Sequence, residues 1–68
     1  MNKEYLNYLF EDEESGEPFF VEITKTSNMT YGECFIRALK IAHENFNKPT
    51  FIEEVTPEIA EIYGYDTY

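Results

Sequence analysis

The 68-residue chain has one cysteine, one histidine and only five basic side chains, and each shortage excludes a class of protein. Cys34 alone cannot form an internal disulfide, so the chain is not a disulfide-stabilised secreted scaffold. One cysteine and His43 are too few for the four-ligand zinc site of small metal-binding domains. No apolar run approaches the ~20 residues that a membrane-spanning helix needs. The first residues lack the apolar stretch of a signal peptide, so we expect a cytoplasmic protein.

The scarcity of bases makes the chain acidic, with 14 Asp and Glu against 5 Lys and Arg and a net charge of −9. Proteins gain affinity for nucleic acids by neutralising phosphates, so we expect neither direct nucleic-acid binding nor attachment to anionic membranes. Residues 1–24 hold seven acids and one base, and residues 49–68 hold five acids and no base. Residues 25–48 hold two acids and four bases. This acidity favours a basic protein as the partner.

The first half of the chain predicts a β-hairpin. Residues 5–11 alternate as a strand would, although their apolar side chains would also suit a helix. The context favours the strand, because an acidic loop with Gly16 follows it. After the loop comes the segment 18–24, which is rich in β-branched and aromatic residues and begins with Pro18, as a second strand would.

A long central helix follows. Thr30 and Glu33 form a capping-box pattern, and Pro49 predicts an end near Asn47. The helical periodicity gathers an apolar stripe, consisting of Tyr31, Phe35, Ala38, Leu39, Ala42 and Phe46, widened by Cys34, Ile36 and Ile41.

Residues 50–55 read as a third strand, and a second, short helix starts at Thr56 with Pro57 in its first turn and Gly64 as its stop. The order β-β-α-β-α predicts one small α+β domain over residues 1–68. We expect an antiparallel three-stranded sheet in the order 2-1-3 with the long helix on one face. Little or nothing is then expected to cover the second face.

No constellation predicts catalysis, a cofactor or a metal. Carboxylates in the loop 11–17 are consecutive and lack the spacing of a calcium loop, so a solvated turn is favoured. Cys34 and His43 are nine positions apart on one helix, about 13 Å of rise, too far for a nucleophile–base pair. Glu58 and Glu61 are neighbours on the short helix, but we expect them to be surface charges. The chain is therefore predicted not to be an enzyme.

The uncovered sheet face is the most informative prediction. If Leu6, Tyr8 and Phe10 face the helix, the opposite face mixes apolar and acidic side chains, as protein-binding surfaces do. Its candidate residues are Tyr5, Leu9, Glu11, Phe20, Glu22, Ile52 and Glu54. The alternative is that the short helix and the aromatic tail 65–68 fold over this face.

Together these features predict a small non-catalytic interaction module, either a homodimer or an adaptor for a basic partner. The alternative function is an inhibitor, of the kind that bacterial mobile elements and phages encode, which imitates nucleic acid by presenting carboxylates where phosphates would lie.

Overall fold

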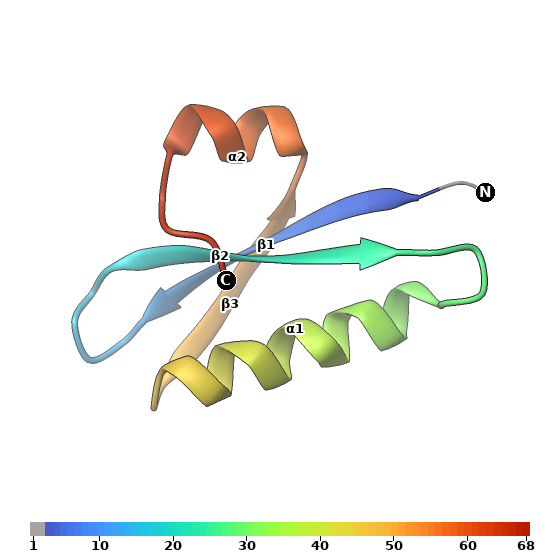
Figure 1. Cartoon of the computed structure of the whole chain (residues 1–68). Helices are drawn as coiled ribbons and strands as arrows, with labels where there is room; N and C mark the ends of the chain where they lie inside the picture. Colours follow the sequence, from blue (N-terminus) through green and yellow to red (C-terminus); the bar gives the residue numbers. More distant parts are fainter. Residues whose placement is uncertain (1–2) are drawn as a thin grey trace.

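The first two strands form the predicted hairpin in the computed structural model, which describes residues 3–68 (Figure 1). Strand β1 (Glu4–Asp12) pairs antiparallel through its residues 4–11 with the whole of β2 (Pro18–Lys25). In the connecting loop the Asp12 carboxylate accepts a hydrogen bond of 2.8 Å from the Ser15 hydroxyl, and Gly16 takes a φ of 75°, which glycine adopts without steric cost. The strand interpretation of residues 5–11 is confirmed.

The remaining elements follow in the predicted order: α1 (Tyr31–Asn45), β3 (Pro49–Val55) and α2 (Pro57–Tyr63). The sheet has the order β2-β1-β3, and both pairings are antiparallel. The predicted α+β fold and its topology are therefore confirmed. The sheet lies between the two helices, with α1 on one face and α2 on the other (Figure 1).

Helix α1 packs on the sheet through small side chains. Cys34, Ala38 and Ala42 are completely buried, at four-residue spacing along one line of the helix. The centre of the apolar stripe therefore runs through Cys34, which the sequence had placed at its border, whereas Tyr31 and Ile36 are exposed. The Thr30 hydroxyl caps the helix by accepting from the Glu33 amide at 3.1 Å.

The hydrophobic core fills the space between α1 and the sheet. Phe10 and Phe19 stack at a ring-centroid distance of 5.5 Å, and Phe46 stacks on Phe19 at 4.1 Å. The sheet contributes alternate residues of both hairpin strands to this core, as the period of two predicts: Leu6, Tyr8, Phe10, Phe19, Val21 and Ile23.

A β-bulge interrupts the pairing of β1 with β3. Phe51 lies opposite Phe10, but Glu53 and not Ile52 lies opposite Leu9. One extra residue reverses the alternation of the strand beyond it. Residue Glu54, opposite Tyr8, consequently shares the face of α1, and its predicted place on the other face is wrong.

The second face of the sheet is covered, so the expectation of an open face is wrong. Helix α2 crosses this face, and residues 64–68 continue from it to the free edge of β2 (Figure 1). Tyr63 and Tyr65 stack over Phe20 at centroid distances of 6.3 and 5.6 Å. Phe20 is therefore only 1% exposed. Simple alternation left this aromatic residue outward, and the C-terminal segment buries it.

Helices long and apolar enough to cross a membrane do not occur among residues 3–68.

Candidate functional site

The seven residues of the predicted interaction surface differ in exposure and in the face of the sheet on which they lie. Leu9 and Phe20 are 7% and 1% exposed, so their side chains contribute almost nothing to the accessible surface. Glu54 lies on the α1 side of the sheet. The other four residues remain exposed: Tyr5, Glu11, Glu22 and Ile52. The accessible surface on this side is therefore built largely by α2 and the tail, and only partly by the strands.

The tail is fixed to β2 by main-chain hydrogen bonds. The amides of Phe20 and Glu22 donate to the carbonyls of Asp66 and Tyr68 at 2.8 and 3.0 Å. The Tyr68 amide donates back to the Phe20 carbonyl at 2.9 Å. These bonds make residues 66–68 a short parallel extension of the sheet beside β2.

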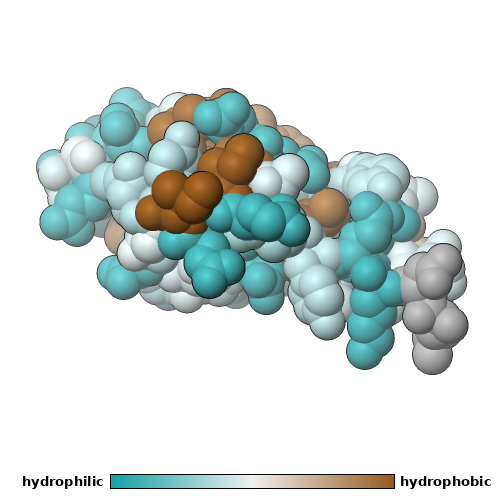
Figure 2. Space-filling view, turned by 90° about the horizontal axis from the view of Figure 1, so that it is seen from above, coloured by the Kyte–Doolittle hydropathy of each residue, from teal (hydrophilic) through white to brown (hydrophobic). Residues whose placement is uncertain are grey.

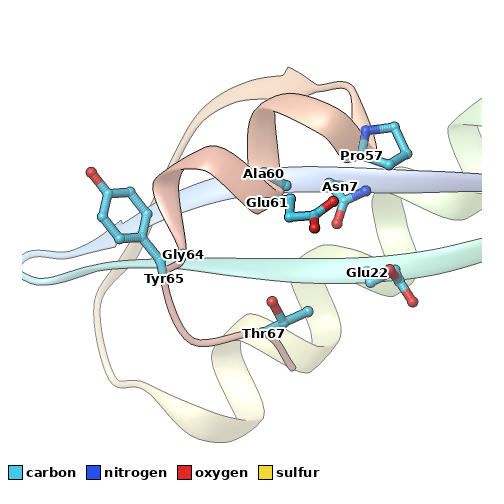
Figure 3. A pocket seen from close by; sticks show the side chains of 8 residues that line it. All are labelled: Asn7, Glu22, Pro57, Ala60, Glu61, Gly64, Tyr65 and Thr67. Carbon is cyan, nitrogen blue, oxygen red and sulfur yellow. The ribbon is translucent and has the colours of Figure 1, made fainter.

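A hollow of about 330 Å³ opens between α2, the tail and the sheet (Figure 3). Its volume lies at the lower end of the range of small-ligand sites. Strand β1 contributes Asn7 and strand β2 contributes Glu22. The other lining residues come from α2 and the tail: Pro57, Ala60, Glu61, Gly64, Tyr65 and Thr67. The left-handed Gly64, with a φ of 67°, ends α2 and turns the chain along one side of this hollow.

Asn7 lies beside Glu61 beneath α2 (Figure 3). The residue is only 3% exposed, and its side-chain Nδ2 is buried without a hydrogen-bond partner. Leaving a buried donor unpaired costs about 1–3 kcal/mol, which is why folded proteins pair nearly all such groups. The unpaired amide of Asn7 therefore distinguishes this hollow from an ordinary surface depression.

The hollow has a negative charge. Glu22 and Glu61 are its ionisable carboxylates, and no lysine or arginine lines it. Within residues 3–68 neither carboxylate takes part in a hydrogen bond. The two unpaired carboxylates can accept hydrogen bonds from a cation, and the unpaired amide nitrogen can donate a hydrogen bond to a neutral oxygen.

The surface around the hollow combines apolar and hydrophilic side chains. Seen from the α2 side, apolar atoms are surrounded by hydrophilic ones (Figure 2). Ile62 is 80% exposed, and Ile59 and Tyr63 are also exposed on this helix. An exposed mixture of this kind is typical of protein-binding surfaces.

The other chemical candidates remain apart. Cys34 is buried on the side of α1 that packs on the sheet, whereas His43 is exposed on the same helix. Over the part of the chain that the structure describes, no three His, Cys, Asp or Glu side chains converge as metal ligands would. In the turn after β1 the side chains of Asp12 and Ser15 instead hold the loop through hydrogen bonds.

On the opposite side of the sheet, two tyrosines lie near carboxylates. Burial, reinforced by Glu54, raises the pKa of Tyr8 to about 12. The Tyr31 hydroxyl donates to Glu4 at 2.7 Å, and this hydrogen bond raises the pKa of Tyr31. Both shifts favour the neutral hydroxyl, so neither tyrosine is activated as a base or nucleophile.

Asn7 is not among the residues that the sequence predicts for the interaction surface, although alternation with Leu6 and Tyr8 puts it on that face of β1. Its signal was present, since asparagine is disfavoured in strands and Asn7 stands between apolar neighbours. Glu61, Gly64 and Thr67 carried no such signal. Their approach to Asn7 depends on the path of the chain after β3.

No protein-family model, no curated protein and no solved structure matches this chain. The chemistry of the site is therefore the basis on which a function is proposed.

Proposed function

We propose that this protein is a non-catalytic interaction module that binds a basic partner protein through its α2 side. The observation that carries this proposal is the difference in charge between the two helices, of which only α2 has acids without bases. Residues 49–68 contain five acids and no base, and apart from Glu54, which faces α1, these acids belong to β3, α2 and the tail. Helix α1, on the other face of the sheet, carries the bases Arg37 and Lys40 together with Glu33 and Glu44, so its charges balance. A surface of one sign attracts a partner of the other sign and repels competitors.

Exposed apolar side chains support a protein as the partner. Ile59 and Ile62 stand on α2 next to Glu58 and Glu61. Burying such side chains contributes roughly 25 cal/mol per Å² of apolar area, which supplements the electrostatic attraction. A nucleic acid offers no comparable apolar surface, and its phosphates would be repelled. The separation of Cys34 from His43 supports a role without catalysis.

The charge also favours a different protein over a second copy of this one. A symmetric dimer through the α2 side would bring identical acidic patches together, because a two-fold interface uses the same surface twice. Like charges in such an interface lower its affinity. An adaptor for a basic protein is therefore preferred to the homodimer.

Capture of partners from a lysate of the source cell tests the proposal. The α2-side variant combines Glu53→Gln, Glu58→Gln and Asp66→Asn. The matched control combines Glu17→Gln, Glu33→Gln and Glu44→Gln, which changes the net charge equally at sites away from α2. We expect the natural protein and the control to retain a partner of positive net charge, and the α2-side variant to lose it. Retention should weaken as salt rises from about 0.05 to 0.5 M, because salt screens exposed charges.

Two outcomes would contradict the adaptor role. Equal capture by both variants would show that the α2 side is not the interface. Release of the partner by added double-stranded DNA would instead support the nucleic-acid-mimicking inhibitor. Size-exclusion chromatography with light scattering tests separately whether the protein is a homodimer, and we expect the mass of a monomer, 8.1 kDa.

A further inference from the structure

We infer that the hollow beneath α2 binds an arginine residue of the partner, taking its guanidinium between Glu22 and Glu61 and its main-chain carbonyl at Asn7. This inference rests on the proposed function and names the chemical group that the acidic surface recognises. It depends on three groups that line one hollow: two carboxylates without hydrogen bonds and a buried amide without an acceptor.

The carboxylates of Glu22 and Glu61 define the cationic part of the ligand. They come from β2 and α2, so they approach the hollow from the sheet and from the helix (Figure 3). A guanidinium carries five N–H donors in a planar fork and can bond two carboxylates together. An ammonium group is a more strongly hydrated point charge without this fork, so lysine should bind less tightly than arginine.

Asn7 defines the neutral part of the ligand. Its unpaired Nδ2 can only donate, so a guanidinium, which has no acceptor, cannot satisfy it. A main-chain carbonyl can accept from Nδ2 without adding a negative charge beside Glu61. A free amino acid would bring its own carboxylate into this acidic hollow. These requirements favour arginine within a peptide over free arginine.

The size and lining of the hollow agree with a side chain as its occupant. At about 330 Å³ it is far larger than a single cation needs, and Pro57 and Ala60 supply apolar walls. The methylene groups of arginine can lie against such walls while the guanidinium reaches the carboxylates. The Thr67 hydroxyl offers one further acceptor at the tail.

Nuclear magnetic resonance titration tests the inference with the peptide acetyl-Gly-Arg-Gly-amide. The same peptide with citrulline keeps the shape of arginine without its charge, and a lysine peptide keeps the charge without the fork. We expect the arginine peptide to shift the side-chain amide signals of Asn7 in a saturable way. The citrulline peptide should produce no saturable shift, and the lysine peptide should bind several-fold more weakly.

Four variants locate the binding. Glu22→Gln and Glu61→Gln should each weaken binding of the arginine peptide by about tenfold, the effect of one charged hydrogen bond. Glu58→Gln is the matched control, because Glu58 lies on the same helix outside the hollow, and its effect should stay below about twofold. Asn7→Val should weaken binding while raising the urea midpoint of unfolding, because it removes an unpaired buried donor.

The results separate this inference from the proposed function. An unshifted Asn7 amide, or equal effects of Glu58→Gln and Glu61→Gln, would overturn the arginine site. The salt-sensitive capture of a basic partner would then still stand. If the arginine peptide binds as inferred and the lysate yields no basic partner, the hollow remains an arginine site and the adaptor role fails.

Discussion

Glu54 lies directly opposite Tyr8 across the β1–β3 ladder, on the face of the sheet that packs against α1. The bulge between Leu9 and Phe10 creates this relationship, since an uninterrupted β3 would turn Glu54 to the other face. A carboxylate consequently stands next to Tyr8, a residue that is only 3% exposed, and it adds to the effect of burial on the pKa of Tyr8.

This pair predicts a loss of stability at high pH. The pKa of Tyr8 is raised from 10.0 to about 12 by folding, so between these values the unfolded chain releases the proton and the native chain retains it. Stability is therefore unaffected by this group below pH 10 and falls as pH rises towards 12, by on the order of 2 kcal/mol. Urea unfolding at pH 9 and pH 11.5 measures the loss.

Tyr8→Phe should remove most of this dependence, because the ring remains and the ionisable group is lost. Tyr5→Phe is the control, since Tyr5 is exposed at the start of β1 and its removal should leave the pH dependence in place. The same loss between pH 9 and 11.5 in Tyr8→Phe would show that another group causes it.

The small residues of α1 predict a steric limit at the helix–sheet contact. Ala38 is completely buried in the middle of the line formed by Cys34, Ala38 and Ala42. Ala38→Leu should lower the free energy of unfolding by about 1–3 kcal/mol, because a larger side chain forces the helix from the sheet. Ile36→Leu, at an exposed position of the same helix, should change it by less than about 0.5 kcal/mol. An unfolding curve of Ala38→Leu that overlays that of the natural protein would contradict this close packing.

The tail predicts a local effect on hydrogen exchange. The Tyr68 ring makes edge-on contacts with Phe19 and Phe46, so Tyr68→Ala should cost about 0.5–1.5 kcal/mol. Exchange of the Phe20 and Glu22 amides should accelerate, because they donate to the tail. In the control Ile62→Ala, which truncates an exposed side chain, these amides should keep their protection. Unchanged exchange at Phe20 in Tyr68→Ala would mean that the ring does not hold the tail.

Two glycines predict stability changes of opposite sign. Gly64 has a φ of 67°, so Gly64→Ala should cost about 1 kcal/mol through backbone strain although its surroundings are open. Gly64→Asn should cost less, because asparagine tolerates this conformation. Gly32 lies in the first turn of α1 without a positive φ, and Gly32→Ala should stabilise the protein by about 0.5–1 kcal/mol. Thermal unfolding of the three variants measures these changes, and stabilisation by Gly64→Ala would rule out the left-handed turn.

The hairpin and both helices could be predicted because their signals are local. Alternation identified Leu6, Tyr8 and Phe10 as core residues, and Thr30 and Thr56 cap the helices as expected, each accepting from the amide three residues later. The sheet order followed because the chain must return beside β1 after α1. The predicted surface was less successful, since Leu9 and Phe20 are buried and Glu54 faces α1.

These errors have two physical causes that local patterns do not record. A bulge adds one residue to β3 and reverses the direction of Glu54. The sequence of β3 does not reveal the extra residue, because its apolar and acidic residues come in adjacent pairs, Phe51-Ile52 and Glu53-Glu54. The position of α2 depends on the path after Thr56 and on which aromatic rings meet Phe20, and these contacts join distant parts of the chain.

The sequence by itself determined the strands, the helices, their order and the acidity of the last twenty residues, because these depend on side-chain periodicity, capping and composition. Only the tertiary structure decided that Asn7, Glu22 and Glu61 line one hollow and that Asn7 Nδ2 has no partner. These residues come from three different elements, and Glu22 and Glu61 are more than 35 positions apart in the sequence. Their proximity depends on packing between distant segments, and no local sequence pattern encodes such packing.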